Sequence, residues 1–470
     1  MKYIPGRTHQ LTLLLLAWVA VTCMALASVA ATIRYTMPAG VQLHSPTIQR
    51  VRGVDASKLL QQTVTVEGFY YDGSIPMVID DIDRVALDMP LPDESFVPVV
   101  GTVPATLKSG DRVSISGTLF RPTNNDPVGV RGETTALRIV NAGQIKVLKP
   151  TTLPRLTINT TIKIPAGGIK LTKNRYAVLI AGCINPSNNH VRYWNDLVTM
   201  YNILIGRGFQ PSNIYVLYAD GIPRPGSSLT IPVNYDATPA SIMTVFNQLN
   251  LKVTANDDVY VMLNDHGGGL MTVPTGGYAA GMYGGIVDPA GGDAFDEKYN
   301  EAALHMDING DGNQNAIVAV HQVLCLWNWA NMTDRQFAAE VNKVSRAKTI
   351  VIQMKQCFNG GFINNLRAAN RIIMSSSSSD QPSWGHGPDY NFGEFTFWYF
   401  AALTGHKPDG SGAVDADANH DGKISITEAY NFARIHDTQP EILYYEDDGV
   451  IPAHNVPTGT EGVLGSAYIL

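Results

Sequence analysis

From Arg175 onward, continuous apolar runs alternate with segments of helical periodicity, and this alternation limits most strongly how the chain can fold. The run 175–181 (RYAVLIA) is apolar enough for a strand buried on both faces. The segment 192–208 (RYWNDLVTMYNILIGRG) places large apolar side chains on one helical stripe before a glycine. Further strands are expected in DDVYVML, KTIVIQMKQ and NRIIMSS, and further helices in PASIMTVFNQLN and GEFTFWYFAAL. The pattern predicts an α/β fold with a mainly parallel sheet flanked by helices.

Residues 32–150 show a different pattern, with short alternating strands and glycine turns. TVTVEGFYY and SGDRVSISGTLF each alternate apolar and polar residues, and ALRIVNAGQIKVL is typical of a closing hairpin. We therefore expect a small all-β domain here, a barrel or sandwich, with an OB-like barrel as one arrangement. The proline- and threonine-rich stretch 151–173 then predicts a linker between the two parts.

The first 31 residues have the pattern of an export signal. Lys2 and Arg7 precede an apolar stretch from Leu11 to Leu26, and small residues follow it. Cleavage after these small residues predicts a secreted or cell-envelope protein. An uncleaved anchor or a lipid-anchored Cys23 are the alternatives. No later stretch is apolar enough to cross a bilayer, so no membrane contact is expected beyond this signal.

Charge and cysteine content narrow the function classes. The 470-residue chain has a net charge of −7 and no basic cluster, which argues against nucleic acid as a partner. Removal of the signal leaves Cys183, Cys325 and Cys357, so at least one thiol stays free. A free thiol is what a cysteine enzyme needs, although three buried packing cysteines would give the same count.

Two expected strands end in residues that can perform thiol chemistry. His266 follows one apolar run in NDHGGG, and Cys357 follows another in MKQCFNGGF, each with glycines close behind. Carboxyl ends of parallel strands meet at one edge of a sheet, where ligands bind. A histidine there can activate a thiolate, and glycines let backbone N–H groups face a developing oxyanion. Simple packing roles for both residues are the alternative.

The two segments VYVMLNDHGGG and TIVIQMKQCFNGGF together resemble the paired blocks of the caspase-like cysteine peptidases. The loop VLIAGCINPSNNHVRYWND, with Arg192 four residues before Asp196, is similar to the legumain-like branch of that group. The resemblance covers about residues 174–405 and implies a caspase-like peptidase domain. It also implies that His266 and Cys357 form a catalytic dyad, with the amides of Gly267 and Cys357 as the oxyanion hole.

The resemblance further implies a substrate pocket lined by Arg192 and Glu394, with the serine run Ser375–Ser379, including Ser376, as its wall. An arginine facing a carboxylate favours Asn before the scissile bond, whereas an arginine alone favours Asp. Glu394 could instead serve only as a helix N-terminal charge, and the serines only as a loop. Gln356 and Phe358, on either side of the cysteine, depart from the usual acidic or small residues of these peptidases and leave substrate preference open.

A calcium loop is predicted in the C-terminal segment 406–470. DANHDGKISITE matches the EF-hand loop position by position, with a glycine at the sharp turn. The expected ligands are Asp417, Asn419, Asp421, the carbonyl of Lys423, and Glu428. DINGDG, from Asp307 to Gly312, repeats the first half of such a loop but lacks the closing glutamate. Asp288, Asp293 and Asp296 could help it, or the region could be a solvated lid.

The sequence thus predicts an exported, calcium-stabilised cysteine endopeptidase that acts on proteins or peptides. A transpeptidase is an alternative, because an amine can resolve the same acyl-enzyme. An alternative of another class is a calcium-binding surface or adhesion protein that retains an inactive peptidase fold.

Overall fold

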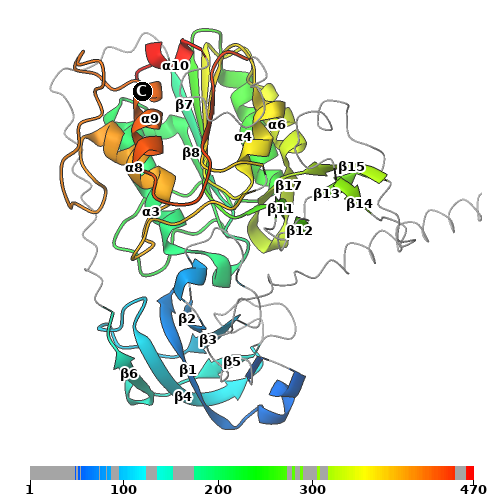
Figure 1. The fold of residues 1–470 in the computed structure, drawn as a ribbon, viewed down its shortest axis with the longest axis vertical. Helices are drawn as coiled ribbons and strands as arrows, with labels where there is room; N and C mark the ends of the chain where they lie inside the picture. The colour runs from blue at the N-terminus through cyan, green and yellow to red at the C-terminus, as the bar shows by residue number, and fades with distance from the viewer. Residues whose placement is uncertain are drawn as a thin grey trace, which may run out of the picture.

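The chain forms a β-barrel in its N-terminal part and a larger α/β core from residue 174 onward (Figure 1). The predicted signal, nearly all of the predicted linker and the Asp307–Asp311 turn lie outside the described residues. The computed structural model describes residues 48, 51–52, 54–73, 75–80, 82–85, 91, 95–122, 135–151, 174–272, 278–280, 286–288, 304–306, 316–379, 381–449 and 462–470.

The barrel is a closed ring of five strands in the order β1-β2-β3-β5-β4, with β4 pairing back onto β1. Most pairs are antiparallel, but β3 and β5 run parallel, so the ring is mixed. A further strand, β6, pairs with β4. The expected closing hairpin is therefore wrong, because both of its arms pair with β4 instead. The strands are β1 (Thr63–Asp72), β2 (Pro76–Ile79), β3 (Phe96–Val100), β4 (Arg112–Phe120), β5 (Ala136–Arg138) and β6 (Ile145–Lys149).

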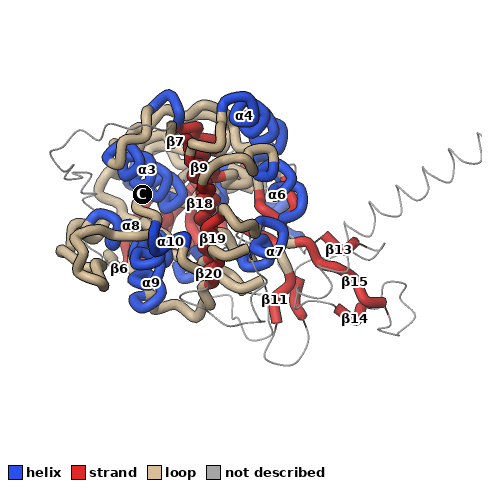
Figure 2. The backbone as a smooth tube through the Cα atoms, turned by 90° about the horizontal axis from the view of Figure 1, so that it is seen from above, coloured by secondary structure: helices blue, strands red, loops and turns tan. Residues whose placement is uncertain are grey.

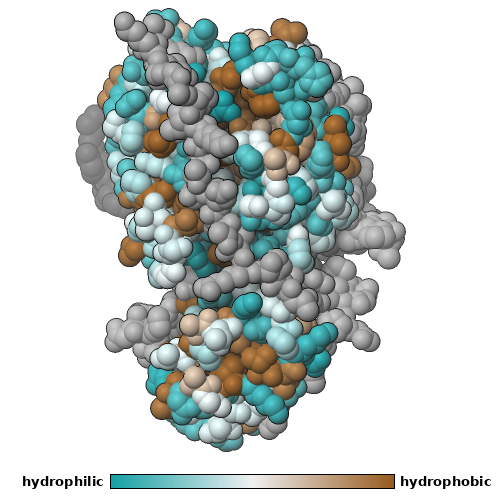
Figure 3. Space-filling model, turned by 90° about the vertical axis from the view of Figure 1, so that its left-hand side faces the viewer, coloured by the Kyte–Doolittle hydropathy of each residue, from teal (hydrophilic) through white to brown (hydrophobic). Residues whose placement is uncertain are grey.

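The barrel interior follows from the alternation along its strands. Val66, Val113 and Ile115 are among the side chains that point inward and form one buried cluster. A second cluster, which includes Tyr71 and Val85, lies toward the α/β core and packs against the partly buried Tyr390 of that core. The face of the barrel seen in Figure 3 also carries hydrophobic side chains at its surface.

The α/β core is built on a six-stranded sheet in the order β20-β19-β18-β9-β7-β8. Neighbouring strands from β8 to β19 pair in parallel, and β20 runs antiparallel at the edge. The strands are β7 (Arg175–Ala181), β8 (Ile214–Tyr218), β9 (Asp258–Leu263), β18 (Thr349–Met354), β19 (Arg371–Ser375) and β20 (Tyr444–Glu446).

Helices lie on either side of these strands when the molecule is seen from above (Figure 2). One group, α3, α8 and α9, packs against one face, and α4, α6 and α7 pack against the other. The helices are α3 (Val191–Gly206), α4 (Pro239–Lys252), α6 (Asp334–Asn342), α7 (Ile363–Leu366), α8 (Glu394–Thr404), α9 (Ile426–His436) and α10 (Leu464–Ala467). Among the described helices, none combines the length and apolar character needed to span a bilayer.

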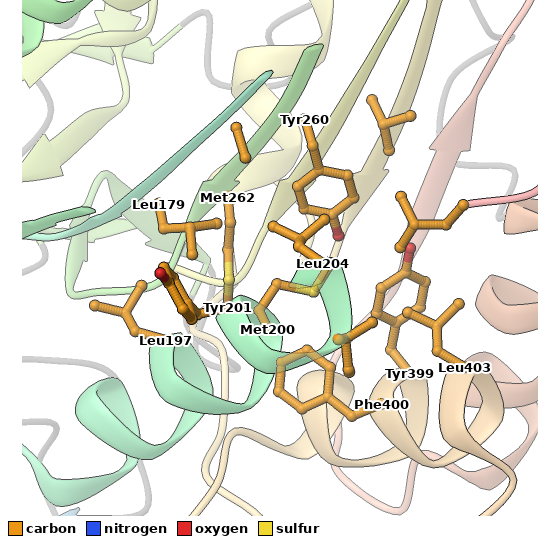
Figure 4. Close-up of a cluster of buried hydrophobic side chains, with 14 of the residues drawn as sticks. Leu179, Leu197, Met200, Tyr201, Leu204, Tyr260, Met262, Tyr399, Phe400 and Leu403 are labelled. Atoms are coloured by element: carbon orange, nitrogen blue, oxygen red, sulfur yellow. The ribbon is translucent and has the colours of Figure 1, made fainter. Parts of the chain in front are cut away.

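The stripe of α3 explains how the first helix docks on the sheet. Leu197, Met200 and Leu204 point from α3 toward Met262 of the sheet and Phe400 of α8 (Figure 4). Each of these side chains is at most 1% exposed, and burying a side chain of this size contributes roughly 1.5–3 kcal/mol. This packing fixes the N-terminus of α3 relative to the strand ends.

The predicted fold class is wrong as a description of this chain. The predicted arrangement, a caspase-like and mainly parallel sheet preceded by an all-β domain, does not account for the closed mixed barrel or the antiparallel β20. It also does not account for the small antiparallel ladders formed by the stretch of sequence that connects β9 to β18. The apolar runs showed which segments are buried, but burial does not determine strand direction. The ladders are formed by β10 (Gly267–Gly268), β16 (Val323–Cys325) and β17 (Asn331–Thr333), by β11 (Leu270–Thr272) and β12 (Tyr278–Ala280), and by β13 (Ile286–Asp288), β15 (Ala316–His321) and β14 (Leu304–Met306).

Candidate active site

The register of two neighbouring strands places His266 and Cys357 at one edge of the sheet. Leu263, the last residue of β9, pairs in parallel with Met354, the last residue of β18. His266 follows Leu263 by three positions, and Cys357 follows Met354 by three positions. Both side chains are completely buried. His266 and Cys357 therefore stand just beyond the ends of two adjacent parallel strands.

The glycine after the histidine brings the two segments into backbone contact. A Cβ atom at Gly267 would lie 2.0 Å from the carbonyl oxygen of Cys357 and 3.0 Å from its nitrogen. Only glycine allows this approach without displacement of the cysteine. The residue after Cys357 continues the tight geometry, since Phe358 adopts the left-handed conformation with φ of 61°.

Contacts of the His266 ring determine its tautomer. The Nε2 atom lies 2.8 Å from the carbonyl oxygen of Asn188. A carbonyl can only accept, so neutral His266 carries its proton on Nε2 and leaves Nδ1 as the nitrogen that can accept one. The ring also meets the ring of Tyr193 edge-on, with centroids 5.1 Å apart.

Asp265 fixes the backbone that carries the histidine. One carboxylate oxygen accepts the N–H of His266 at 2.6 Å, and the other accepts the N–H of Cys183 at 2.8 Å. Cys183 lies just beyond β7, so this carboxylate joins the ends of two neighbouring parallel strands. It thereby holds the backbone of His266 in place.

The thiol of Cys357 faces polar groups from the serine-rich segment. The backbone N–H of Ser383 points at Sγ from 3.2 Å, a contact that favours the thiolate. The hydroxyl of Ser383 lies 2.8 Å from that of Ser376, which also accepts a hydrogen bond from the Asn359 side chain at 2.8 Å. Ser376 thus links Ser383, which faces the thiol, to Asn359.

The other two thiols have the environment of packing residues. Burial, and then the negative charge of Asp265, raise the pKa of both Cys183 and Cys325 well above the ordinary cysteine value. All three described cysteines are free of disulfides. A thiol with a raised pKa is a poor nucleophile at neutral pH.

Two further charged or titratable groups surround the imidazole. The His190 ring centroid lies 5.0 Å from that of His266, and the Arg192 guanidinium lies over Tyr193 at 5.0 Å. Burial, followed by the electrostatic influence of Arg192 and of His266, lowers the pKa of His190 well below its usual value. His190 is therefore neutral at physiological pH, and its Nε2 is buried without a hydrogen-bond partner.

The two residues predicted to determine specificity, Arg192 and Glu394, have hydrogen-bond partners in different parts of the fold. Arg192 is buried near the strand ends and donates from Nη1 to the carbonyl of Val85 in the barrel. Glu394 is equally buried but is engaged on the α8–α9 side, with His386 Nδ1 at 2.6 Å and Thr438 at 3.0 Å. Burial alone would raise the pKa of Glu394, but hydrogen bonding and charge from His386, together with Thr438 and Trp398, lower it overall.

Asp196, the acidic partner in the arginine loop, has a structural role. Its carboxylate accepts hydrogen bonds from the Gly393 N–H at 3.2 Å and the Thr396 hydroxyl at 2.7 Å. These groups belong to the first turn of α8, where backbone N–H groups need acceptors. Asp196 therefore ties α3 to the start of α8.

The predicted calcium loop is folded with its carboxylates turned toward its own backbone. Asp417 accepts the N–H groups of Asp421 and Gly422, and Glu428 reaches back across the loop to the Asn419 N–H at 3.2 Å. Gly422 has φ of 79°, as the sharp turn requires. In the described part of the chain, no three His, Cys, Asp or Glu side chains cluster closely enough to hold a metal ion. The donor set nevertheless consists of the hard oxygens that suit calcium.

Sequence patterns did not identify three groups that shape this site: the Asn188 carbonyl, the Asp265 carboxylate and the Ser383 amide. Two of them act through the backbone, which leaves no trace in the residue type. Asp265 stands next to His266 in the sequence, so an acidic residue beside a strand-end histidine was the available signal.

Comparisons with known proteins add little to this picture. No family model matches the chain, and no curated protein sequence matches it. Among solved structures, the crystal structure of protein GSU0716 from Geobacter sulfurreducens is similar, with 12% sequence identity and a TM-score of 0.34. The match covers 58% of this chain and 92% of that one. A likeness this distant carries no argument about fold or activity.

Proposed function

We propose that this protein is a cysteine peptidase in which Cys357 is the nucleophile and His266 the general base and acid. The observation that carries the proposal is the in-register pairing of Leu263 and Met354, each of which lies three residues before one member of the proposed dyad. The resemblance of both segments to the legumain-like peptidases supports the same roles. The Ser383 N–H that points at Sγ of Cys357 from 3.2 Å would stabilise a thiolate at that position and further supports Cys357 as the nucleophile.

The proposed reaction proceeds through an acyl-enzyme. Nδ1 of His266 accepts the thiol proton as Sγ of Cys357 attacks the peptide carbonyl, and the carbonyl electron pair moves onto oxygen. The amides of Gly267 and Cys357 stabilise that oxyanion. The carbonyl then re-forms, the C–N bond breaks, and His266 returns the proton to the leaving amine. Water, deprotonated by His266, releases the acyl group and restores the thiol.

Arg192 is the residue we propose for recognition of the side chain before the scissile bond. It is a buried cation at the N-terminus of α3, close to the strand ends. Glu394 is held by His386 and Thr438, so its contribution to specificity is best tested separately. A peptide library should show preference for Asn or Asp at this position, and preference for Lys or Arg would contradict the assignment.

We also propose that calcium has a structural role, bound by the loop from Asp417 to Glu428, and that the protein is exported by its N-terminal signal. Neither the thiol nor the imidazole of the proposed dyad requires a metal for the reaction. Calcium bound at this loop would fix the start of α9, whose first turn is already capped by Ser425 and Glu428. Stability would then rise with free calcium.

A covalent probe tests the proposed function directly. A peptide carrying a thiol-reactive group should label the protein once per chain at Cys357, and Cys357→Ala should abolish that labelling. Cys325→Ala is the matched control, because Cys325 is a buried free thiol near the same strand ends. Labelling that persists in Cys357→Ala would refute the proposal and favour an inactive, calcium-binding surface protein.

A further inference from the structure

The barrel and the α/β core are joined by hydrogen bonds that converge on the candidate site. The Tyr71 hydroxyl lies 2.8 Å from Nδ1 of His190. The N–H of Leu91 donates to the Asn188 side chain at 2.8 Å. These partners belong to the short segment that precedes α3 and holds the candidate site on one side.

Two arginines extend this interface. Arg192 donates to the carbonyl of Val85, and Arg224 donates to the carbonyl of Asp72 at 3.2 Å. Arg224 also donates to the Asn189 carbonyl at 3.1 Å, so it fixes the same segment from the core side. The arginine proposed for substrate recognition is thus already bound to a backbone carbonyl of the barrel.

Two of the barrel groups that contact the site are a backbone carbonyl and a backbone N–H, the same kinds of group that a bound peptide substrate would present. Val85 supplies a carbonyl acceptor to Arg192, and Leu91 supplies an N–H donor to Asn188. The same Asn188 holds Nε2 of His266 through its own carbonyl. His190, Arg192 and His266 are all completely buried.

We propose that the N-terminal barrel is an inhibitory domain that keeps the enzyme latent by occupying the substrate side of its own site. The inference rests on the proposed peptidase function. A substrate has to displace Val85 and Leu91 to reach Arg192 and Asn188, so activity requires the barrel to move away. A buried site closed by several hydrogen bonds opens only when these break together.

The opposite arrangement would make the barrel part of the working enzyme. In that case Tyr71 would position His190 against His266, and loss of the Tyr71 hydroxyl would slow catalysis. The two arrangements therefore predict opposite signs for one substitution, Tyr71→Phe.

The test uses the full chain with Tyr71→Phe, alone and combined with Arg224→Gln. The matched control is Tyr70→Phe, since the Tyr70 hydroxyl bonds only weakly, at 3.4 Å, to Asp72 within the barrel. The rate of Cys357 labelling by the thiol-reactive peptide measures access to the site. Hydrogen exchange of residues 185–192 measures release of the barrel independently of any chemistry.

We expect Tyr71→Phe to raise the labelling rate about tenfold, as loss of one hydrogen bond across a closed interface allows. The double variant should raise it further, with faster exchange at 185–192, whereas Tyr70→Phe should behave as the wild type. If the wild type is labelled and the variants are labelled at the same rate or more slowly, the inhibitory role of the barrel is overturned. The peptidase proposal would stand. Faster hydrogen exchange at residues 185–192 without labelling of Cys357 in any variant would overturn both the inhibitory role of the barrel and the peptidase proposal.

Discussion

Gly267 lies so close to Cys357 that a Cβ atom there would stand 2.0 Å from the cysteine's carbonyl oxygen. The contact joins the backbones of the two residues. It ties the peptide after the histidine to the peptide that carries the thiol. The position of the thiol therefore depends on the absence of a side chain at residue 267.

Gly267→Ala should remove activity while the proposed dyad residues are unchanged. The added methyl has to push the Cys357 peptide away, and overpacking of this kind costs about 1–3 kcal/mol of folding free energy. Peptide hydrolysis should fall at least about a hundredfold, because misplacing a reacting group by an ångström costs that much. Gly143→Ala, in the barrel, is the control, since the nearest atom to an added Cβ there is a side-chain oxygen of Asn141 at 3.1 Å and not a backbone atom. Normal hydrolysis by Gly267→Ala would show that the thiol tolerates the shift.

Alanine substitutions of the proposed dyad and of a second buried cysteine should distinguish a catalytic role from a packing role. Cys357→Ala and His266→Ala should each abolish peptide hydrolysis, because the nucleophile or its base is lost. Cys183→Ala should retain it, since burial keeps the pKa of that thiol high and the side chain serves packing. Circular dichroism should show that all three variants fold. Turnover by Cys357→Ala would exclude the thiol mechanism.

Asp265→Asn should lower the catalytic rate constant more than it changes KM. The carboxylate accepts two backbone N–H groups, those of His266 and Cys183, and an amide can offer only one acceptor oxygen. One buried N–H then faces a donor, which costs about 1–3 kcal/mol of stability and releases the histidine backbone. Asp334→Asn is a matched control, because Asp334 also accepts the N–H of the next residue but lies on α6. Equal kinetic losses in both variants would argue against a positioning role.

Calcium should raise the melting temperature of the native protein. Binding to the folded state alone adds stability as free calcium increases. Glu428→Gln should lose most of this response, because the bidentate carboxylate at the last loop position is removed. Glu441→Gln, outside the loop, should keep it. If chelation stopped hydrolysis at once without changing the melting temperature, calcium would have to act in catalysis.

Asp437 should make the protein less stable as pH rises toward neutrality. Burial raises the pKa of this carboxyl from its ordinary value to about 7. The folded state therefore binds a proton that the unfolded state releases near pH 4, and stability falls between pH 4 and 7. Asp437→Asn should raise the melting temperature at pH 8 and change it little at pH 4. An equal gain at both pH values would mean that packing, not charge, is responsible.

The sequence was most informative where a continuous apolar run ends. The runs before His266 and Cys357 are β9 and β18, and the polar residues after them stand at one sheet edge. The helical stripe after Arg192 is likewise α3. Periodicity reports burial on one or two faces, and that information is local to each segment.

The partner and the direction of each strand could not be predicted from the local sequence pattern. The parallel pairing of β3 with β5, the closure of β4 on β1 and the antiparallel β20 depend on contacts between distant segments. The proposed pairing of Glu394 with Arg192 has the same weakness, because His386 and Thr438 approach Glu394 from other parts of the chain. Residue types alone do not show which of several partners a buried carboxylate selects.

The strand that extends the barrel also affects how separate molecules behave at high concentration. β6 (Ile145–Lys149) pairs with β4, and among the described strands it has no partner on its other edge. Val147 and Leu148 are 44% and 40% exposed there. Such an edge can recruit a strand from another molecule, and lysines are a common protection. Lys146 and Lys149 supply that charge, so acetylation of these lysines would favour edge-to-edge association and reduce solubility.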